Sequence, residues 1–337
     1  MTTTFALPAG LEATAPPPHR DGVRLLVARP GGVEHARFRA LGTFLAPGDL
    51  LIVNTSGTLA AAVDGTRGDG RPVTVHFASA LDDGSWVIEV RPAHGATGPV
   101  PDSRPGDLIT LPGEVRAVLV RPHPGGQTRL WQATVAGAAG VLAYLERHGR
   151  PIRYAYLRGP VPLADYQTVF AREPGSAEMP SAGRPFTTEL VTDLVTRGIG
   201  IAPITLHTGV SSQDAGEPPQ PERFAVPAAT ARAVNLTRAA GGRVVAVGTT
   251  ATRALESAAD RAGVVHGRAG WTGLVLSRDR PAVAVTGLIT GWHAPGASHL
   301  DLLAAVAGAG LVGRAYEEAV RARYRWHEFG DSCLLLP

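Results

Sequence analysis

Helical and strand-like patterns alternate along the second half of the sequence, and this alternation limits the chain to a small set of folds. In the helical stretches apolar residues recur on one face, whereas the strand-like runs are short, continuous and apolar. The expected helices cover residues 188–197, 228–239, 251–261, 298–308 and 313–323. The expected strands between and after them cover residues 199–207, 244–247, 283–289 and 333–336. This order predicts an α/β domain with a mostly parallel sheet.

The first half of the sequence contributes strands of two kinds. The runs at 24–28, 35–39 and 50–54 are expected to be the first strands of the α/β domain. Shorter alternating runs follow, separated by turn residues, at 73–77, 86–90, 108–111, 115–120 and 130–135. Their spacing is typical of a small all-β barrel or sandwich. We therefore expect a discontinuous α/β domain, residues 1–67 and 150–337, with an inserted small all-β barrel domain at residues 68–149.

The segment from Tyr166 to Thr187 is too polar, and too often interrupted by glycine and proline, for a helix or a core strand. Thr187 or Thr188 can cap the helix that follows, whose first backbone N–H groups favour an anion. Long loops inside compact domains are usually functional or disordered. We therefore interpret this segment as part of a site, with an ordinary surface connection as the alternative. Its polar groups include the carboxylate of Glu173 and the hydroxyl of Ser181.

Gly248, Thr249 and Thr250 lie where an expected strand ends and a helix begins. Such a turn can bind an anion or another ligand at the helix N-terminus. It contains one glycine, so it does not match the three-glycine dinucleotide fingerprint. Arg253 and Glu256 follow on the first turns of the helix, where they can either point into the site or pair with each other. We favour a ligand-binding role because the turn lies at the carboxyl end of a strand.

Two histidines also follow expected strands. His207 ends one strand, and Thr290 and His293 end another, so both imidazoles can take part in proton transfer near neutral pH or serve a structural role. Asp331 places a carboxylate in a tight turn before the last strand, as a reactive group or as a cap of backbone N–H groups. No combination of histidine and carboxylate has the spacing of a metal site, so we predict no metal.

Composition excludes several mechanisms. All 32 positions occupied by lysine or arginine are arginine, which excludes a lysine Schiff base and a P-loop lysine. The formal net charge of +3 permits an anionic partner without requiring one. The single cysteine, Cys333, excludes an internal disulfide and fits a reducing cytoplasm. Neither a signal peptide nor a membrane span is expected, so we predict a cytoplasmic protein.

Several motifs occur in order over nearly the whole chain. They are Asp21–Leu26, Pro47–Asn54, Tyr166–Val169, Glu173–Ser176, Pro180–Gly183, Phe186–Thr187, Ala246–Ser257, Gly287–Thr290 and Phe329–Asp331. Together they resemble the S-adenosylmethionine:tRNA ribosyltransferase-isomerase family of queuosine biosynthesis. The resemblance implies an α/β domain with an inserted β-barrel, which is also the fold that the patterning predicts.

The resemblance implies transfer of the ribosyl part of S-adenosylmethionine to the 7-aminomethyl-7-deazaguanine base of a tRNA, with release of adenine and methionine. The product is epoxyqueuosine, and S-adenosylmethionine is a substrate, so no further cofactor is expected. The reaction needs a base near the acidified C5′ protons and a proton donor to adenine. The expected catalytic residues are Glu173, His207, His293 and Asp331. The expected substrate-binding residues are Tyr166, Gln167, Ser181, Gly183, Gly248, Thr249, Thr250, Arg253 and Thr290.

The sequence departs from the family pattern at three places. Gly57 stands where the family has arginine, and Pro185 stands where it has histidine. The segment from Ser211 to Glu222 is shorter than its family counterpart and contains no histidine. These departures leave open a paralogue that uses S-adenosylmethionine on a small-molecule acceptor or in a different step, and an inactive nucleoside- or RNA-binding protein. The oligomeric state is also open.

Overall fold

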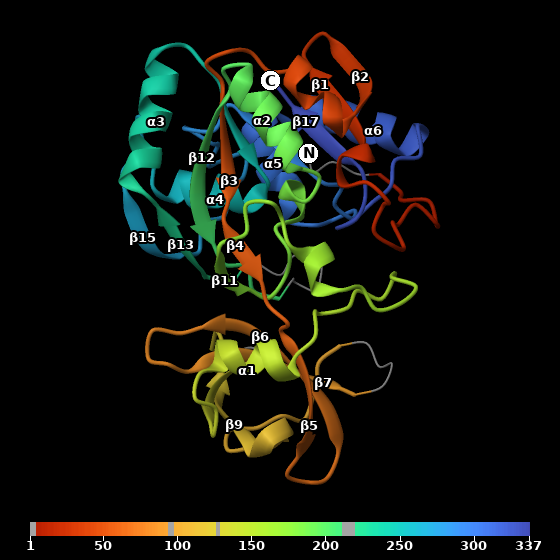
Figure 1. Ribbon diagram of the computed structural model, residues 1–337, viewed down its shortest axis with the longest axis vertical. Coiled ribbons are helices and arrows are strands. Elements are labelled where there is room, and N and C mark those ends of the chain that lie inside the picture. Colours follow the sequence, from red (N-terminus) through yellow and green to blue (C-terminus); the bar gives the residue numbers. More distant parts are fainter. Residues whose placement is uncertain (1–4, 94–97, 126–128, 211–219) are drawn as a thin grey trace.

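The computed structural model describes residues 5–93, 98–125, 129–210 and 220–337. A nine-stranded sheet forms the larger part of the molecule (Figure 1). In spatial order its strands are β15 (Arg268–Thr272), β13 (Glu222–Val226), β12 (Gly200–Leu206), β3 (Leu50–Asn54), β14 (Val244–Val247), β16 (Gly287–Thr290), β17 (Ser332–Leu335), β1 (Arg24–Arg29) and β2 (Gly32–Arg37). The α/β class that the alternating patterns predict is confirmed.

Parallel strands occupy the centre of this sheet. β12, β3, β14 and β16 are mutually parallel neighbours, and β1 is parallel to β17. The remaining pairs are antiparallel, including both edges of the sheet. The sheet is therefore mixed, with the carboxyl ends of its central strands along one edge.

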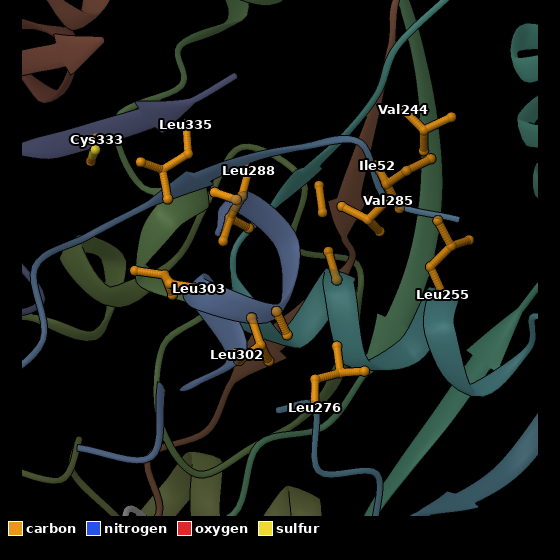
Figure 2. Packing of buried hydrophobic residues seen from close by; sticks show 14 of the residues in the cluster. Ile52, Val244, Leu255, Leu276, Val285, Leu288, Leu302, Leu303, Cys333 and Leu335 are labelled. Atoms are coloured by element: carbon orange, nitrogen blue, oxygen red, sulfur yellow. The ribbon is translucent and has the colours of Figure 1, made fainter. Parts of the chain in front are cut away.

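Alternating residues of the central strands supply two cores. In β3, Leu50 and Ile52 belong to one buried cluster, whereas Leu51 and Val53 belong to the cluster on the opposite face. This is the two-residue period expected of a strand that is covered on both faces. Figure 2 shows Leu255 and Leu303 packed on the first of these faces.

The helices occupy both faces of the sheet. They are α2 (Thr188–Thr196), α3 (Ala228–Ala239), α4 (Thr249–Ser257), α5 (His299–Ala307) and α6 (Ala309–Arg321). Short 3-10 turns lie at Arg20–Gly22, Phe38–Thr43, Pro112–Glu114, Leu163–Tyr166 and Ser181–Gly183. Thr187 caps α2, because its Oγ1 accepts a hydrogen bond of 3.2 Å from the backbone N–H of Leu190. Gly198 follows with a φ of +79°, which favours glycine at this helix end.

The smaller part of the molecule is a closed barrel of six antiparallel strands. They are β5 (Ala62–Arg67), β6 (Pro72–Ala80), β7 (Trp86–Pro92), β8 (Leu108–Leu111), β9 (Val115–Pro122) and β10 (Leu130–Ala136), followed by the helix α1 (Val141–His148). Buried side chains such as Val75, Phe77 and Ile88 fill the interior. The barrel begins at Ala62, a few residues before the domain boundary at residue 68 that the sequence suggests. That division into domains stays a prediction.

A small two-stranded sheet lies between the large sheet and the barrel (Figure 1). Its strands are β4 (Ser56–Thr58) and β11 (Glu173–Ser176), paired in parallel. The central polar segment is thus not loop throughout, because four of its residues form a strand. The side-chain amide of Gln167 strengthens this junction by donating to the carbonyl of Thr58 at 2.8 Å and accepting from its N–H at 3.0 Å.

The strand expected at residues 283–289 is shorter in the structure. Only Gly287–Thr290 pairs within the sheet. The backbone N–H groups of Val283, Ala284 and Val285 instead donate to the carboxylate of Glu256, at 2.8–2.9 Å. A buried side chain has therefore replaced the neighbouring strand as the hydrogen-bond acceptor.

Candidate functional site

A cleft opens at the carboxyl ends of β12, β14 and β16. Its walls come from segments far apart in the sequence, and the lining residues are Glu178–Ala182, Thr208–Val210, Gln220, Glu222, Gly248–Thr250, Arg253, Leu274–Leu276, Thr290, Gly291, His293, Ser298, His299, Leu302 and Glu328. Ligands of α/β sheets bind outside the carboxyl ends of the parallel strands. The position of the cleft therefore matches that of a ligand site.

The glycine turn and the central polar segment meet in this cleft. Gly248 has a φ of +95°, and a Cβ atom added there would lie 3.3 Å from the Cβ of Ala182. Both the conformation and the close approach therefore favour glycine at this position. The two segments that the sequence singles out separately, residues 166–187 and 248–250, are therefore in contact at this point.

The N-terminus of α4 forms one wall of the cleft. Thr249 and Thr250 begin this helix, and the first N–H groups of an α-helix lack partners within the helix. Asn54 holds the turn in place, because its Nδ2 donates to the carbonyl of Leu206 at 2.9 Å and to Thr250 Oγ1 at 3.2 Å. The ends of β3 and β12 are thereby tied to the start of α4. Such a helix end can bind a carboxylate or a sugar hydroxyl.

Arg253 is buried in the adjacent wall, with 7% of its surface exposed. Its guanidinium forms an ion pair with Glu222 and donates to the carbonyl of Leu274 at 3.0 Å. The second oxygen of Glu222 accepts from the backbone N–H of Gly209 at 3.2 Å. Arg253 therefore pairs with Glu222 and not with Glu256, which was the surface alternative. The pair fixes both ends of the segment between β12 and β13.

Two histidines stack inside the cleft. The rings of His293 and His299 have centroids 4.4 Å apart and are nearly parallel, with an angle of 2° between their planes. The Nε2 atom of His293 lies 3.1 Å from the hydroxyl of Thr290. Desolvation in the cleft lowers the pKa of His293 well below its ordinary value and that of His299 to about 4, although much of the surface of His299 is exposed. Both imidazoles are therefore neutral at neutral pH and can accept a proton or a hydrogen bond.

Glu328 also lines the cleft, and sequence reasoning missed it. Its Oε2 atom is buried and has no hydrogen-bond partner among the residues that the structure describes. Burial raises the pKa of this carboxyl to about 7. Glu328 directly precedes the Phe329–Asp331 motif, and this position is the sequence signal for it. His299 and Glu178 are further cleft residues that the sequence did not single out.

The expected site residues fall into two groups. Those that line the cleft are Ser181, Gly248, Thr249, Thr250, Arg253, Thr290 and His293. Those that lie outside its lining are Tyr166, Gln167, Glu173, Gly183, His207 and Asp331. The central segment and the two strand-end turns are therefore brought together, although only some of their side chains reach the cleft. The roles of all these residues stay predictions.

The residues outside the lining support the structure around it. Asp331 accepts hydrogen bonds from the backbone N–H groups of Arg24 and Arg325, at 2.7 and 2.8 Å, which is the capping alternative of the sequence analysis. The Nδ1 atom of His207 lies 2.7 Å from the hydroxyl of Ser56. Burial lowers the pKa of His207, while the charge of Glu173 opposes this shift. His207 and Glu173 are thus neighbours beside the cleft.

Tyr166 and Gly183 are buried near that same wall. The ring of Tyr166 packs edge-on against Phe329, with centroids 5.3 Å apart. A Cβ atom at Gly183 would lie 3.3 Å from the side chain of Thr168. Both residues therefore shape the segment that carries Ser181 into the cleft.

The departures from the family pattern have structural counterparts. Gly57 lies in β4 opposite Pro174. Pro185 is buried and follows Arg184, whose guanidinium lies 4.8 Å from the ring centre of Phe329. In the shortened segment, residues 211–219 lie outside the described residues, whereas Gln220 and Glu222 line the cleft.

Two further features are absent from the residues that the structure describes. These residues contain no group of three or more histidine, cysteine, aspartate or glutamate side chains that could hold a metal ion. No helix within these ranges is long and apolar enough to cross a membrane.

Fold and cleft together define a class: an α/β protein that carries a β-barrel and a ligand cleft at the carboxyl ends of its parallel strands. The sequence model of the queuosine biosynthesis protein family matches residues 2–335. Similar proteins called S-adenosylmethionine:tRNA ribosyltransferase-isomerase occur in Moorella thermoacetica, at 38% identity, and in Symbiobacterium thermophilum, at 37% identity. Each alignment covers 98% of this chain and 98% of the relative.

A solved structure agrees with these sequence relatives. The crystal structure of the S-adenosylmethionine tRNA ribosyltransferase from Thermotoga maritima matches with a TM-score of 0.56 and 29% identity, over 99% of both chains. The chain belongs to the S-adenosylmethionine:tRNA ribosyltransferase-isomerase family of queuosine biosynthesis. The resemblance drawn from the sequence motifs is confirmed.

Proposed function

We propose that this chain transfers and isomerises the ribosyl part of S-adenosylmethionine onto the 7-aminomethyl-7-deazaguanine base of a tRNA, giving epoxyqueuosine, adenine and methionine. Full-length membership of the family supports this function. The observation that links this function to specific residues is the close contact between Gly248 and Ala182, which both line the cleft. S-adenosylmethionine is the substrate that this cleft holds, and the tRNA base is the acceptor.

The cleft offers a suitable environment for each part of S-adenosylmethionine, the donor of the ribosyl group. The N-terminus of α4 at Thr249 and Thr250 suits the methionine carboxylate, because helix N-termini stabilise anions. The apolar side chains of Leu274 and Leu302 suit the faces of the purine. The neutral imidazoles of His293 and His299 suit acceptance of a proton from the sugar. These assignments leave the ribose between the helix end and the histidines.

A second candidate acceptor is favoured by one observation. Two of the three departures from the family pattern, Gly57 and Pro185, lie outside the cleft lining, whereas the turn at residues 248–250 matches the family pattern. A paralogue that uses the same donor with a small-molecule acceptor, or in a different step, would show this pattern. The transfer to tRNA remains the first proposal because the relatives match along their whole length.

A direct assay separates these functions. The protein is incubated with S-adenosylmethionine, with and without a tRNA that carries the aminomethyl base, and adenine and methionine are quantified. Release that depends on the tRNA supports the proposal. Release with a small-molecule acceptor in place of tRNA supports the paralogue. Tight binding of S-adenosylmethionine without turnover under any condition contradicts both and indicates an inactive binding protein.

The place of action follows from the substrate. We propose a cytoplasmic location, since the acceptor is tRNA. The thiol of Cys333 is free and buried, and this agrees with a reducing compartment.

A further inference from the structure

The turn before the last strand carries a carboxyl group into the cleft. Within this turn the backbone N–H of Asp331 donates to the carbonyl of Arg325 at 2.8 Å, and that of Gly330 donates to His327 at 2.9 Å. A Cβ atom at Gly330 would lie 2.4 Å from the carbonyl oxygen of Arg325, so the turn requires glycine there. The turn is therefore closely packed, and it fixes Glu328 at the cleft wall.

The residue before Glu328 has an unusual backbone conformation. His327 has a φ of +70°, which is rare for a residue with a side chain. Its ring stacks on Tyr156, with centroids 4.8 Å apart at an angle of 20°. Residues held in sparsely populated conformations cluster at functional sites. Here the conformation sends His327 toward Tyr156 and leaves Glu328 to line the cleft.

The surroundings of Glu328 contain several titratable groups. Those from the cleft and the elements packed around the turn are Glu12, Tyr154, Glu178, His293, His299 and His327. The cations Arg253 and Arg24 are paired with Glu222 and Asp331, respectively. Desolvation lowers the pKa of all three histidines and raises that of Tyr154, so none of these four bears a positive charge at neutral pH. The buried carboxyl therefore keeps its proton near neutrality, with its pKa raised to about 7.

We propose that Glu328 is the proton donor to the adenine that leaves S-adenosylmethionine. The inference rests on the proposed function and adds a catalytic residue to it. A carboxylic acid inside a ligand cleft, with one oxygen free of partners, is an available hydrogen-bond donor, and a purine ring nitrogen is an acceptor. The neutral histidines are the proton acceptors of the same cleft, so Glu328 and His293 divide the acid and base roles.

The bonds and protons of the ribosyl transfer balance as follows. A base removes a C5′ proton, and the electron pair of that C–H bond stays in the sugar skeleton as it rearranges. The C1′–N bond to adenine breaks, and its electron pair leaves with the purine. The C5′–S bond breaks with its electron pair on methionine, which neutralises the sulfonium. The amine of the acceptor base forms a bond to a sugar carbon and loses one proton to water. The O–H bond of Glu328 breaks and the proton moves to adenine, which leaves a carboxylate. One proton is thus taken up by the base while one is released by Glu328, and exchange with water restores both groups.

The test compares Glu328→Gln with a matched control, Glu317→Gln. Glutamine has the size of the protonated carboxyl but cannot donate its proton in this way. Glu317 is an exposed carboxylate of α6, away from the cleft lining. Adenine release is measured for both variants with S-adenosylmethionine and the aminomethyl tRNA. In D₂O, exchange of the C5′ protons is followed by mass spectrometry, and circular dichroism reports whether each variant is folded.

We expect Glu328→Gln to slow adenine release by about 100-fold or more, the usual contribution of a general acid. Exchange at C5′ should continue at the wild-type rate, and Glu317→Gln should match the wild type in both measurements. Equal loss of exchange and release in Glu328→Gln would make this residue the base and overturn the inference. Unchanged release would also overturn it. A wild-type protein without adenine release contradicts the proposed function itself, so the two failures are distinguishable.

Discussion

Arg253 and Glu222 form a buried ion pair that joins the first turns of α4 to the start of β13. The guanidinium also donates to the carbonyl of Leu274, while Glu222 accepts from the backbone N–H of Gly209. Three walls of the cleft are therefore fixed by one pair of side chains. Arg253 is consequently expected to affect stability as well as ligand binding.

The first prediction concerns the substitution Arg253→Ala. It leaves Glu222 buried and without its cation, so the free energy of unfolding should fall by about 3–5 kcal/mol. Affinity for S-adenosylmethionine should fall as well, because the walls of the cleft lose their common anchor. Denaturant unfolding and calorimetric titration measure the two effects. The matched control Arg261→Ala, at an exposed position, should change the stability by less than about 0.5 kcal/mol. Unchanged stability of Arg253→Ala would contradict the structural role.

The second prediction concerns Glu256, whose carboxylate accepts three backbone hydrogen bonds from residues 283–285. Replacement by alanine leaves these buried donors without an acceptor, so we expect a loss of about 3 kcal/mol of unfolding free energy. Urea denaturation monitored by fluorescence measures the loss. Glu317→Ala removes an exposed carboxylate and serves as the control, with little change expected. Equal midpoints for the two variants would show that Glu256 does not support this segment.

The third prediction compares two substitutions of glycine by alanine. Gly248→Ala forces a positive φ on alanine and places its Cβ against Ala182, so it should destabilise the protein by about 1–3 kcal/mol and weaken donor binding. Gly313→Ala, inside α6 and with no heavy atom within 4 Å of the added Cβ, should stabilise the protein by about 0.5–1 kcal/mol. Thermal unfolding of both variants checks the opposite signs. A stabilising effect at Gly248 would exclude the tight approach of the two segments.

The fourth prediction concerns the pH dependence of stability. The pKa of Glu328 is about 7 in the folded state and near 4.5 when the chain is unfolded, so the folded state binds more protons between these values. Its contribution to stability is therefore greatest below pH 4.5 and is lost as the pH rises through 7. This loss amounts to about 3 kcal/mol. His299, with a folded pKa of about 4, has the opposite slope between pH 4 and 6.5.

The difference between the wild type and Glu328→Gln isolates the carboxyl from the histidines. Unfolding free energies are measured for both proteins at several values between pH 4.5 and 8. Relative to the variant, the wild type should lose about 3 kcal/mol across this range. A difference that does not vary with pH would show that the folded and unfolded pKa values of Glu328 are equal.

Local patterns predicted much of the fold. The run at Leu50–Val53 is continuously apolar because both faces of β3, the strand that contains it, are covered by packed clusters. The turn at Gly248 was recognisable because a strand, a small flexible residue and a helix follow one another. Residues 283–285 were misread as strand because their amides bond to Glu256, a long-range contact that periodicity does not report.

The site was predictable only in part for a similar reason. Thr249, Thr250 and Thr290 reach the cleft because they lie at strand ends, a position that sequence order reveals. Glu328 reaches it through the left-handed conformation of His327 and the tight turn at Gly330, and no spacing rule encodes these.

A crystal structure of the protein with S-adenosylmethionine tests most directly whether the cleft is the donor site. We predict the donor between the turn at Gly248 and the segment at Ser181–Ala182, with its carboxylate at the N-terminus of α4 and its adenine beside Glu328. Donor density on another surface, with this cleft empty, would contradict the proposed site.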